Sequence, residues 1–307
     1  MGRLTQAAPV AWVFPGQGSQ VVGMGRKLYE EIPSARRLYD QADDALSFPL
    51  SRLVFDGPEA DLNLTVNSQP ALLITSLAHL AALRERHVDL PVPAFVAGHS
   101  LGEYTALAAA GSLSPTDAVR LVRARGVAMQ AAGDRSEGGS GMAAVIGADD
   151  AALAEICTEC GVDMANFNAP GQTVISGSKA GVERAGTLIK ERGARRVLPL
   201  AVSIASHSRL MYAAAEQMAA LLADVDFLPP TAPLVPNVTA RPTTNPIEIR
   251  RLLVEQLYSP VRWVESVQYM AGAGVTTFWE IGAGRVLGGL IKRIAPDATI
   301  QNSEAYL

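Results

Sequence analysis

The sequence predicts an α/β protein in which a large unit is interrupted by a smaller one. In the first and last thirds of the 307 residues, short apolar runs alternate with helix-forming runs, as in a sheet covered by helices. Between them, residues 141–202 follow the order strand, helix, strand, strand, helix, strand, which is that of a ferredoxin-like unit. A Gly/Ser-rich stretch at 134–141 separates the two patterns. The expected large domain comprises residues 1–138 and 205–307, and the ferredoxin-like subdomain comprises residues 139–204.

The composition is that of a globular chain able to bury a large core. It is 49% hydrophobic and 18% charged, with a formal net charge of −4. This balance gives no indication of nucleic acid or an anionic membrane as the main partner. Residues 1–9 hold no long apolar run, so no signal peptide is expected, and no segment approaches the ~20 apolar residues that span a bilayer. We expect a cytoplasmic protein.

The first third is expected to hold two buried strands, each followed by a turn that contains glycine. The expected strands are 10–14 and 94–97, and the expected helices are 70–86, 104–110 and 115–132. Pro70 lies near the start of its helix, and Ser114 has the position of an N-cap.

The remaining elements follow from the same patterns. In the smaller unit, the expected strands are 141–146, 162–167, 172–176 and 195–202, and the expected helices are 149–160 and 179–192. After it, the expected helices are 208–225, 247–258, 261–271 and one from 286 onward, with strands at 234–238 and 275–281.

Two motifs have an ordinary structural interpretation beside a functional one. Gly282-Ala283-Gly284 follows a strand as in dinucleotide sites, but no βαβ unit comes after it, which favours a plain strand–helix turn. Cys157 and Cys160 have redox or zinc spacing, but no second Cys or His cluster is near. They also share an apolar helical stripe, so we expect them to pack in a core and expect no metal site.

The stretch at 98–104 has the features of a nucleophile elbow. Gly98-His99-Ser100-Leu101-Gly102 lies between an apolar strand and a helix-forming run. Such a turn exposes its serine on a strained corner, and small residues beside it let substrate and backbone approach. Ser100 is therefore the candidate nucleophile.

A serine nucleophile needs a base within hydrogen-bond reach. The chain has four histidines. His79 and His87 fall on or at the end of the helix expected at 70–86, and His99 should point away from its neighbour Ser100. His207 remains, and it lies where the chain returns from the smaller unit, beside the expected cleft.

Arg125 falls on the apolar face of the helix expected at 115–132. A buried guanidinium must find an anion or several acceptors. Two interpretations stay open, namely a structural ion pair and a clamp for a substrate carboxylate, which guanidinium binds in a planar, bidentate manner. Gln17 follows the first strand; it is either part of a simple turn or, with the amide of Leu101, one of two donors of an oxyanion hole.

Four motifs resemble those of the malonyl-CoA:acyl-carrier-protein transacylase family. They are FPGQGSQ at 14–20, GHSLGEY at 98–104, NFNAPGQ at 166–172 and QLYSPV at 256–261. The resemblance extends over about residues 10–295. It implies an α/β-hydrolase-like large domain with a ferredoxin-like insert, in agreement with the expected elements.

The resemblance also implies roles for single residues. Ser100 would be the acylated nucleophile and His207 the general base and acid, without a triad aspartate. Arg125 would hold the malonyl carboxylate, and Gln17 and Leu101 match the oxyanion-hole positions. Gln256 would orient the histidine through its backbone carbonyl. The acyl group would pass from coenzyme A, a substrate and not a tightly bound cofactor, to Ser100 and then to the phosphopantetheine thiol of acyl carrier protein.

Two departures from the family pattern bear on the substrate. Pro236-Asn237 replaces a frequent Asn-Asn, and Ile204-Ala205-Ser206-His207 is closer to the tetrad of methylmalonyl-loading polyketide acyltransferases, whereas Leu101 resembles the malonyl-selective group. One methyl group is worth only ~1–3 kcal/mol of discrimination, so these hints leave the acyl unit open. The alternatives to malonyl transfer are a trans-acting polyketide acyltransferase with another unit such as methylmalonyl, an acyl hydrolase, and a non-catalytic carrier-binding module.

Overall fold

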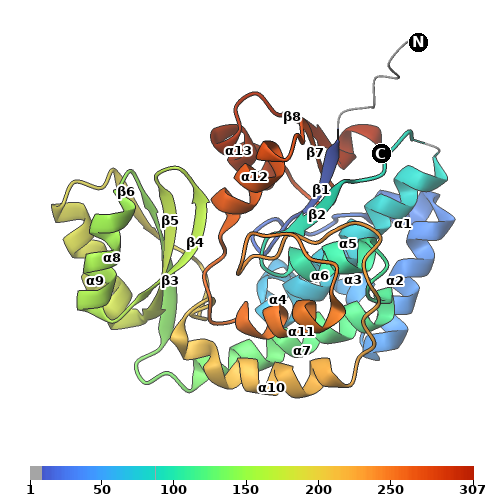
Figure 1. Ribbon diagram of the computed structural model, residues 1–307. Coiled ribbons are helices and arrows are strands. Elements are labelled where there is room, and N and C mark those ends of the chain that lie inside the picture. The colour runs from blue at the N-terminus through green and yellow to red at the C-terminus, as the bar shows by residue number, and fades with distance from the viewer. Residues whose placement is uncertain (1–8, 87) are drawn as a thin grey trace, which may run out of the picture.

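A computed structural model describes residues 9–86 and 88–307 and has two sheets that lie side by side (Figure 1). The larger unit holds a parallel sheet with the strand order β2-β1-β7-β8, and the smaller unit an antiparallel sheet with the order β4-β5-β3-β6. The strands are β1 (Val10–Phe14), β2 (Phe95–Gly98), β3 (Ser140–Ile146), β4 (Asp163–Ala169), β5 (Gln172–Ser178), β6 (Arg196–Pro199), β7 (Thr277–Glu280) and β8 (Thr299–Asn302).

Helices cover both faces of the parallel sheet and one face of the antiparallel sheet. In the larger unit they are α1 (Arg26–Glu31), α2 (Pro33–Leu46), α3 (Leu50–Asp56), α4 (Glu59–Asn63), α5 (Thr65–Glu85), α6 (Gly102–Ala109), α7 (Pro115–Asp134), α10 (Tyr212–Ala223), α11 (Pro246–Glu255), α12 (Trp263–Gly272) and α13 (Val286–Ile294). Short 3₁₀ turns are η1 (Arg209–Met211) and η2 (Ser303–Tyr306). The smaller unit has the α-helices α8 (Asp150–Cys160) and α9 (Lys179–Glu191).

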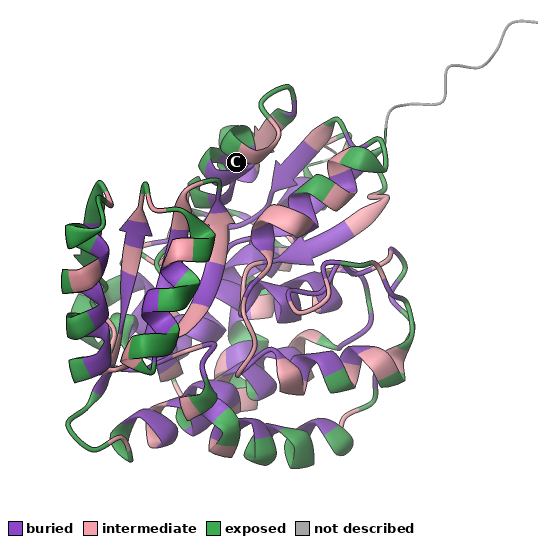
Figure 2. Cartoon of the chain, turned by 60° about the vertical axis from the view of Figure 1, so that its left-hand side comes forward, coloured by how far each residue is buried: buried purple, intermediate pink, exposed green. Residues whose placement is uncertain are grey.

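Strand β1 is apolar along its whole length because both of its faces are covered. Trp12 and Phe14 pack into the core shared with α2, α5, α6, α7 and α10, whereas Ala11 and Val13 pack against α12 and α13. In Figure 2, buried residues accordingly run along the strands and the inward faces of the helices. A strand without an exposed face carries the loop of Gln17 and lies beside β2, which carries Ser100.

The smaller unit has the predicted element order and the sheet order of a ferredoxin-like fold, so the predicted fold class is confirmed. Helices α8 and α9 cover one face, where Cys157 is buried and Cys160 packs beside that core. Burial raises the pKa of Cys157 to about 12, which leaves its thiol unreactive. The other face turns Met142 and Val174 toward the larger unit. The exact domain boundaries stay a prediction.

Some predicted elements differ from the observed ones. Helix α5 begins at Thr65, five residues before Pro70. Pro70 has no N–H for the carbonyl of Val66, and Arg123 Nη1 donates to that carbonyl instead, at 3.1 Å, so the helix continues through the proline. The strand expected at 234–238 is reduced to isolated bridges at Leu234, which two prolines flank closely.

Other differences are matters of extent. Strand β6 ends at Pro199 instead of residue 202, and the helix expected from 208 begins with the 3₁₀ turn η1. Helices α1 to α4 and strand β8 were not predicted. Residues 1–8 and His87, for which we had sequence-based expectations, lie outside the described part of the chain.

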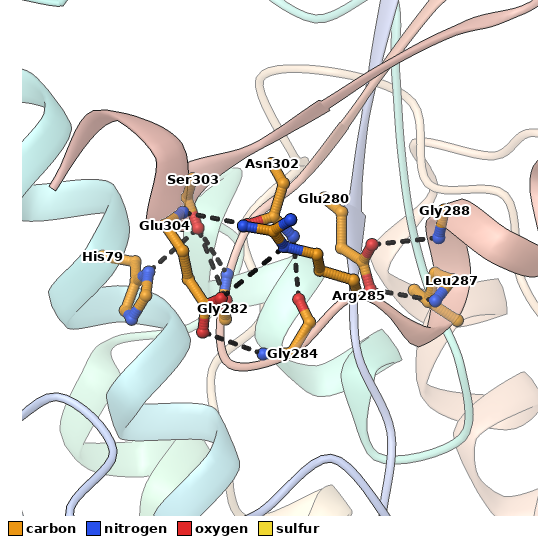
Figure 3. A network of polar contacts seen from close by, with 10 residues as sticks. All are labelled: His79, Glu280, Gly282, Gly284, Arg285, Leu287, Gly288, Asn302, Ser303 and Glu304. Atoms are coloured by element: carbon orange, nitrogen blue, oxygen red, sulfur yellow. Dashed lines mark hydrogen bonds and ion pairs between the residues drawn. The ribbon is translucent and has the colours of Figure 1, made fainter.

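Hydrogen bonds to the buried side chain of Glu280 fix the glycine turn after β7 (Figure 3). The carboxylate of Glu280 accepts hydrogen bonds from the amides of Leu287 and Gly288, both at 2.9 Å, in the first turn of α13. A carboxylate at a helix N-terminus occupies the place in which a dinucleotide phosphate would bind. The predicted strand–helix turn is therefore observed, and its not being a dinucleotide site stays a prediction.

Candidate active site

Ser100 lies on a sharp corner between β2 and α6, with a backbone φ of 53°. This left-handed conformation is strained for a residue with a side chain. The two flanking glycines are required by packing. A Cβ on Gly98 would lie 1.9 Å from the carbonyl atoms of Gly102, and one on Gly102 would lie 2.3 Å from the carbonyl oxygen of Phe14. The Gly-x-Ser-x-Gly pattern thus follows from close backbone approach at the elbow.

His207 completes a dyad with Ser100. Its Nε2 lies 2.9 Å from Ser100 Oγ, and its Nδ1 lies 2.8 Å from the Gln256 carbonyl oxygen and 3.2 Å from that of Ser259. Because carbonyl oxygens only accept, Nδ1 carries the proton and Nε2 presents its lone pair to the hydroxyl. That is the tautomer a general base needs.

The surroundings of His207 keep its imidazole neutral. Its side chain is almost fully buried. Burial, and next the positive charge of Arg125, lower its pKa to about 3. The ring is therefore unprotonated at neutral pH, which is the state that a general base requires.

Arg125 reaches the same corner from α7. Its Nη2 donates to Ser100 Oγ at 3.1 Å and to Gln256 Oε1 at 2.9 Å, and its Nη1 donates to Gln69 Oε1 at 2.8 Å. The residue is 1% exposed, and these described partners are neutral oxygens. A buried cation held by neutral acceptors beside a nucleophile has capacity left for an anion, which favours the carboxylate clamp over the structural ion pair.

A cavity of about 380 Å³ opens in front of the dyad, between the two units. The larger unit lines this cavity with all the predicted site residues except Gln256, namely Gln17, Ser100, Leu101, Arg125 and His207. From the smaller unit and its return segment come Met142, Asn166, Asn168, Val174, Leu200, Ala201 and Val202. Along the described ranges, neither the Gln17 nor the Leu101 amide donates a hydrogen bond to the protein, so both remain available to a substrate oxygen.

Gln256 makes more contacts than predicted. Its backbone carbonyl faces His207, as the family resemblance implied, and its side-chain oxygen accepts from Arg125. Its Nε2 donates to the Ser100 carbonyl oxygen at 3.0 Å. This one residue therefore contacts all three groups.

Asn237 was noted in the sequence only as a departure from a pattern. The structure places its fully buried side chain against the elbow, where Oδ1 accepts from the Ser100 amide at 2.8 Å and Nδ2 donates to the Gly98 carbonyl oxygen at 2.7 Å. Two more residues were absent from the predicted site. Gln69 accepts a hydrogen bond from Arg125, and Glu103 accepts one from Gln256. A polar residue in a proline-rich segment gives little signal, since its partners are distant in sequence.

The other two histidines that the structure describes, His79 and His99, have other contacts. His99 lines the cavity, but its Nε2 lies 2.8 Å from Asn168 Oδ1 and its ring packs edge-on against Trp263. His79 is buried beside Ser303, with 2.9 Å between Nδ1 and Oγ, in the network of Figure 3. Across the described chain, no three His, Cys, Asp or Glu side chains are grouped so that they could hold a metal ion.

Comparisons with known proteins place the chain in a family. A family model described as an acyl transferase domain matches residues 11–294. The chain is 50% identical over 290 residues to the malonyl CoA-acyl carrier protein transacylase of Bacillus subtilis, a match that covers 93% of this chain and 90% of that protein.

Solved structures give the same result. The acyl-carrier-protein-S-malonyltransferase of Bartonella henselae superposes with a TM-score of 0.92 at 43% identity, over 97% of this chain and 98% of that one. A malonyl-transacylase in complex with its type II polyketide synthase acyl-carrier protein also gives 0.92 at 43% identity, over 96% of each chain.

Proposed function

Since the chain belongs to the acyl transferase family, we propose that it transfers a malonyl group from coenzyme A to acyl carrier protein through an acyl-serine intermediate. The observation that carries the proposal is the convergence of a nucleophile, a neutral base and a buried cation on one cavity. Ser100 Oγ lies 2.9 Å from His207 Nε2 and 3.1 Å from Arg125 Nη2. A hydroxyl that contacts both a base and a buried cation with neutral hydrogen-bond partners suits transfer of an acyl group that carries a carboxylate.

In the first half-reaction, Ser100 Oγ attacks the thioester carbonyl while His207 Nε2 takes the hydroxyl proton. The Gln17 and Leu101 amides would stabilise the oxyanion. When the tetrahedral intermediate collapses, the C–S bond breaks and His207 returns the proton to the coenzyme A sulfur. The phosphopantetheine thiol of the carrier then repeats these steps in reverse on the ester. Coenzyme A thioester is a substrate here, and the scheme needs no tightly bound cofactor.

Arg125 links substrate choice to the strength of the base. A malonyl carboxylate paired with its guanidinium would neutralise the charge that helps to lower the pKa of His207. The imidazole would then become a better base when the acyl group carries a carboxylate. A monoacyl hydrolase would have no use for such a cation, which disfavours that alternative.

Every described helix is too short or too polar to cross a bilayer. With coenzyme A and a carrier protein as proposed substrates, we propose a cytoplasmic location.

The test is intact-mass analysis of the protein after incubation with malonyl-CoA, then with carrier protein that bears phosphopantetheine. We expect one malonyl adduct, lost to the carrier on its addition. Methylmalonyl-CoA serves as the matched donor, and equal labelling by both would favour the polyketide alternative. Release of the adduct to water faster than to the carrier would instead identify a hydrolase.

The pH profile provides a second test. Because His207 acts in its neutral form and its pKa lies near 3, kcat/KM should fall at a pH far below the usual histidine value of about 6.5. An acid limb centred at pH 6 to 7 would contradict the buried, neutral base.

Unfolding has to be measured in parallel. In the unfolded chain, His79 and His207 bind protons near pH 6.5, whereas burial lowers the pKa of His79 in the folded protein to about 4. The stability linked to these histidines is present above pH 6.5. It is lost by on the order of 1.4 kcal/mol per pH unit for each as the pH falls from 6.5 to the pKa in the folded protein, about 4 for His79 and about 3 for His207. Rates should therefore be compared only where thermal unfolding shows a folded protein.

A further inference from the structure

Behind the nucleophile lies a carboxylic acid to which the proposed reaction gives no role. Glu103 is in the first turn of α6 and is 0% exposed. Its Oε2 accepts hydrogen bonds from the backbone N–H of Asn237 at 2.9 Å and from Gln256 Nε2 at 3.0 Å. Its Oε1 has no hydrogen-bond partner among the described residues. Because a buried acid costs free energy, its place next to the site calls for an explanation.

Gln256 supplies the connection to the substrate-binding cation. Its side-chain amide lies between Arg125 Nη2, which needs an acceptor, and Glu103 Oε2, which needs a donor. An amide has nearly the same shape when it is turned over, and turned over it would aim an NH₂ group at the guanidinium. Two sets of contacts favour the observed orientation. Arg125 Nη2 donates to Oε1, and Nε2 has as acceptors Glu103 Oε2, the Ser100 carbonyl oxygen and, at 3.5 Å, Asn237 Oδ1.

We propose that Glu103 is a positioning residue for malonyl recognition, acting through the side-chain amide of Gln256 to hold the Arg125 guanidinium against Ser100. This inference rests on the proposed function and adds to it a residue that does not line the substrate cavity. The chain of contacts runs from the Glu103 carboxyl through an amide to a guanidinium and then to the nucleophile.

The charge state of Glu103 leaves this role intact. Burial raises its pKa to about 7, partly offset by its hydrogen bonds to Asn237 and Gln256 and by the charge of Arg125 on α7. A proton, when bound, can sit on the unpartnered Oε1, so Oε2 accepts in both states. The acceptor, and not the negative charge, is what orients the amide.

Two variants of Glu103 test whether its hydrogen-bond acceptor is what matters for malonyl recognition. In Glu103→Gln, the amide oxygen can replace Oε2 and accept both hydrogen bonds, whereas Glu103→Met keeps a similar volume without an acceptor. Loading of Ser100 is measured with malonyl-CoA and, as the acyl group without a carboxylate, acetyl-CoA. We expect Glu103→Met to lower kcat/KM for malonyl-CoA by about 10- to 100-fold, mainly through KM, and to lower kcat/KM for acetyl-CoA much less. For Glu103→Gln, we expect kcat/KM to stay within about 3-fold of the wild type with both donors.

Equal losses for both donors in Glu103→Met would overturn the proposal, because a purely structural role does not distinguish the acyl groups. So would a loss in Glu103→Gln as large as in Glu103→Met. If Glu103→Met does not fold, Gln256→Met breaks the same connection from the other side and must show the same selective loss for malonyl-CoA, or the proposal fails. Malonyl loading of the wild-type protein tests the function separately, so failure of one is distinguishable from failure of the other.

Discussion

Replacing Ser100 with alanine is expected to abolish the malonyl adduct and to lower transfer to the carrier by at least about 10⁴-fold. The substitution removes the atom that forms the ester, while His207 and Arg125 lose only a neutral partner at 2.9 and 3.1 Å. The measurement is intact mass after incubation with malonyl-CoA, combined with the rate of carrier acylation. Binding of malonyl-CoA should persist, because Arg125 remains in place.

The control is Ser206→Ala, which removes another serine hydroxyl that lines the same cavity. It should leave an adduct on Ser100 with the same mass. A persistent adduct in Ser100→Ala would place the nucleophile elsewhere, and Ser206 would be the first residue to check.

Replacing Arg125 with alanine is expected to reverse the preference between acyl groups. The guanidinium is the buried cation at the nucleophile, and a charge-assisted bidentate pair with a carboxylate is worth several kcal/mol. Malonyl loading should therefore fall by about 10²- to 10⁴-fold, while acetyl loading is retained or rises. The measurement is the ratio of kcat/KM for malonyl-CoA to that for acetyl-CoA.

Arg120→Ala makes the same change of charge on the exposed side of the same helix, and it should leave that ratio unchanged. If Arg125→Ala reduced both donors equally, Arg125 would be part of the general scaffold of the site and not a carboxylate clamp.

Ser100 and Arg125 could be predicted from the sequence because their signals are local, whereas His207 was found by elimination and Gln256 through the family resemblance. At the elbow, a glycine lies two positions before and two positions after the serine, between an apolar strand and a helix. Close packing of the backbone explains both glycines. Arg125 stood out as a cation on an apolar helix face, and the structure buries it. Their proximity to His207 is observed, whereas their catalytic roles stay a proposal.

The supporting contacts could not be predicted because they join distant parts of the chain. Asn237 Oδ1 and the Ser100 amide are 137 positions apart, and Gln256 Nε2 and Glu103 Oε2 are 153 apart. No local pattern identifies such partners. The early start of α5 was missed for a similar reason, since a proline is expected near a helix start unless a distant arginine satisfies the freed carbonyl.

The proposed catalytic groups all come from the larger unit, whereas much of the opposite cavity wall is supplied by the sheet of the smaller one. The larger unit therefore supplies the proposed bond-making groups and the proposed carboxylate clamp, whereas the smaller unit shapes much of the rest of the cavity. Substitutions at Met142 or Val174 would change the shape of the cavity and leave the contact between Ser100 and His207 in place, so new acyl groups could be admitted while the reaction itself stays the same.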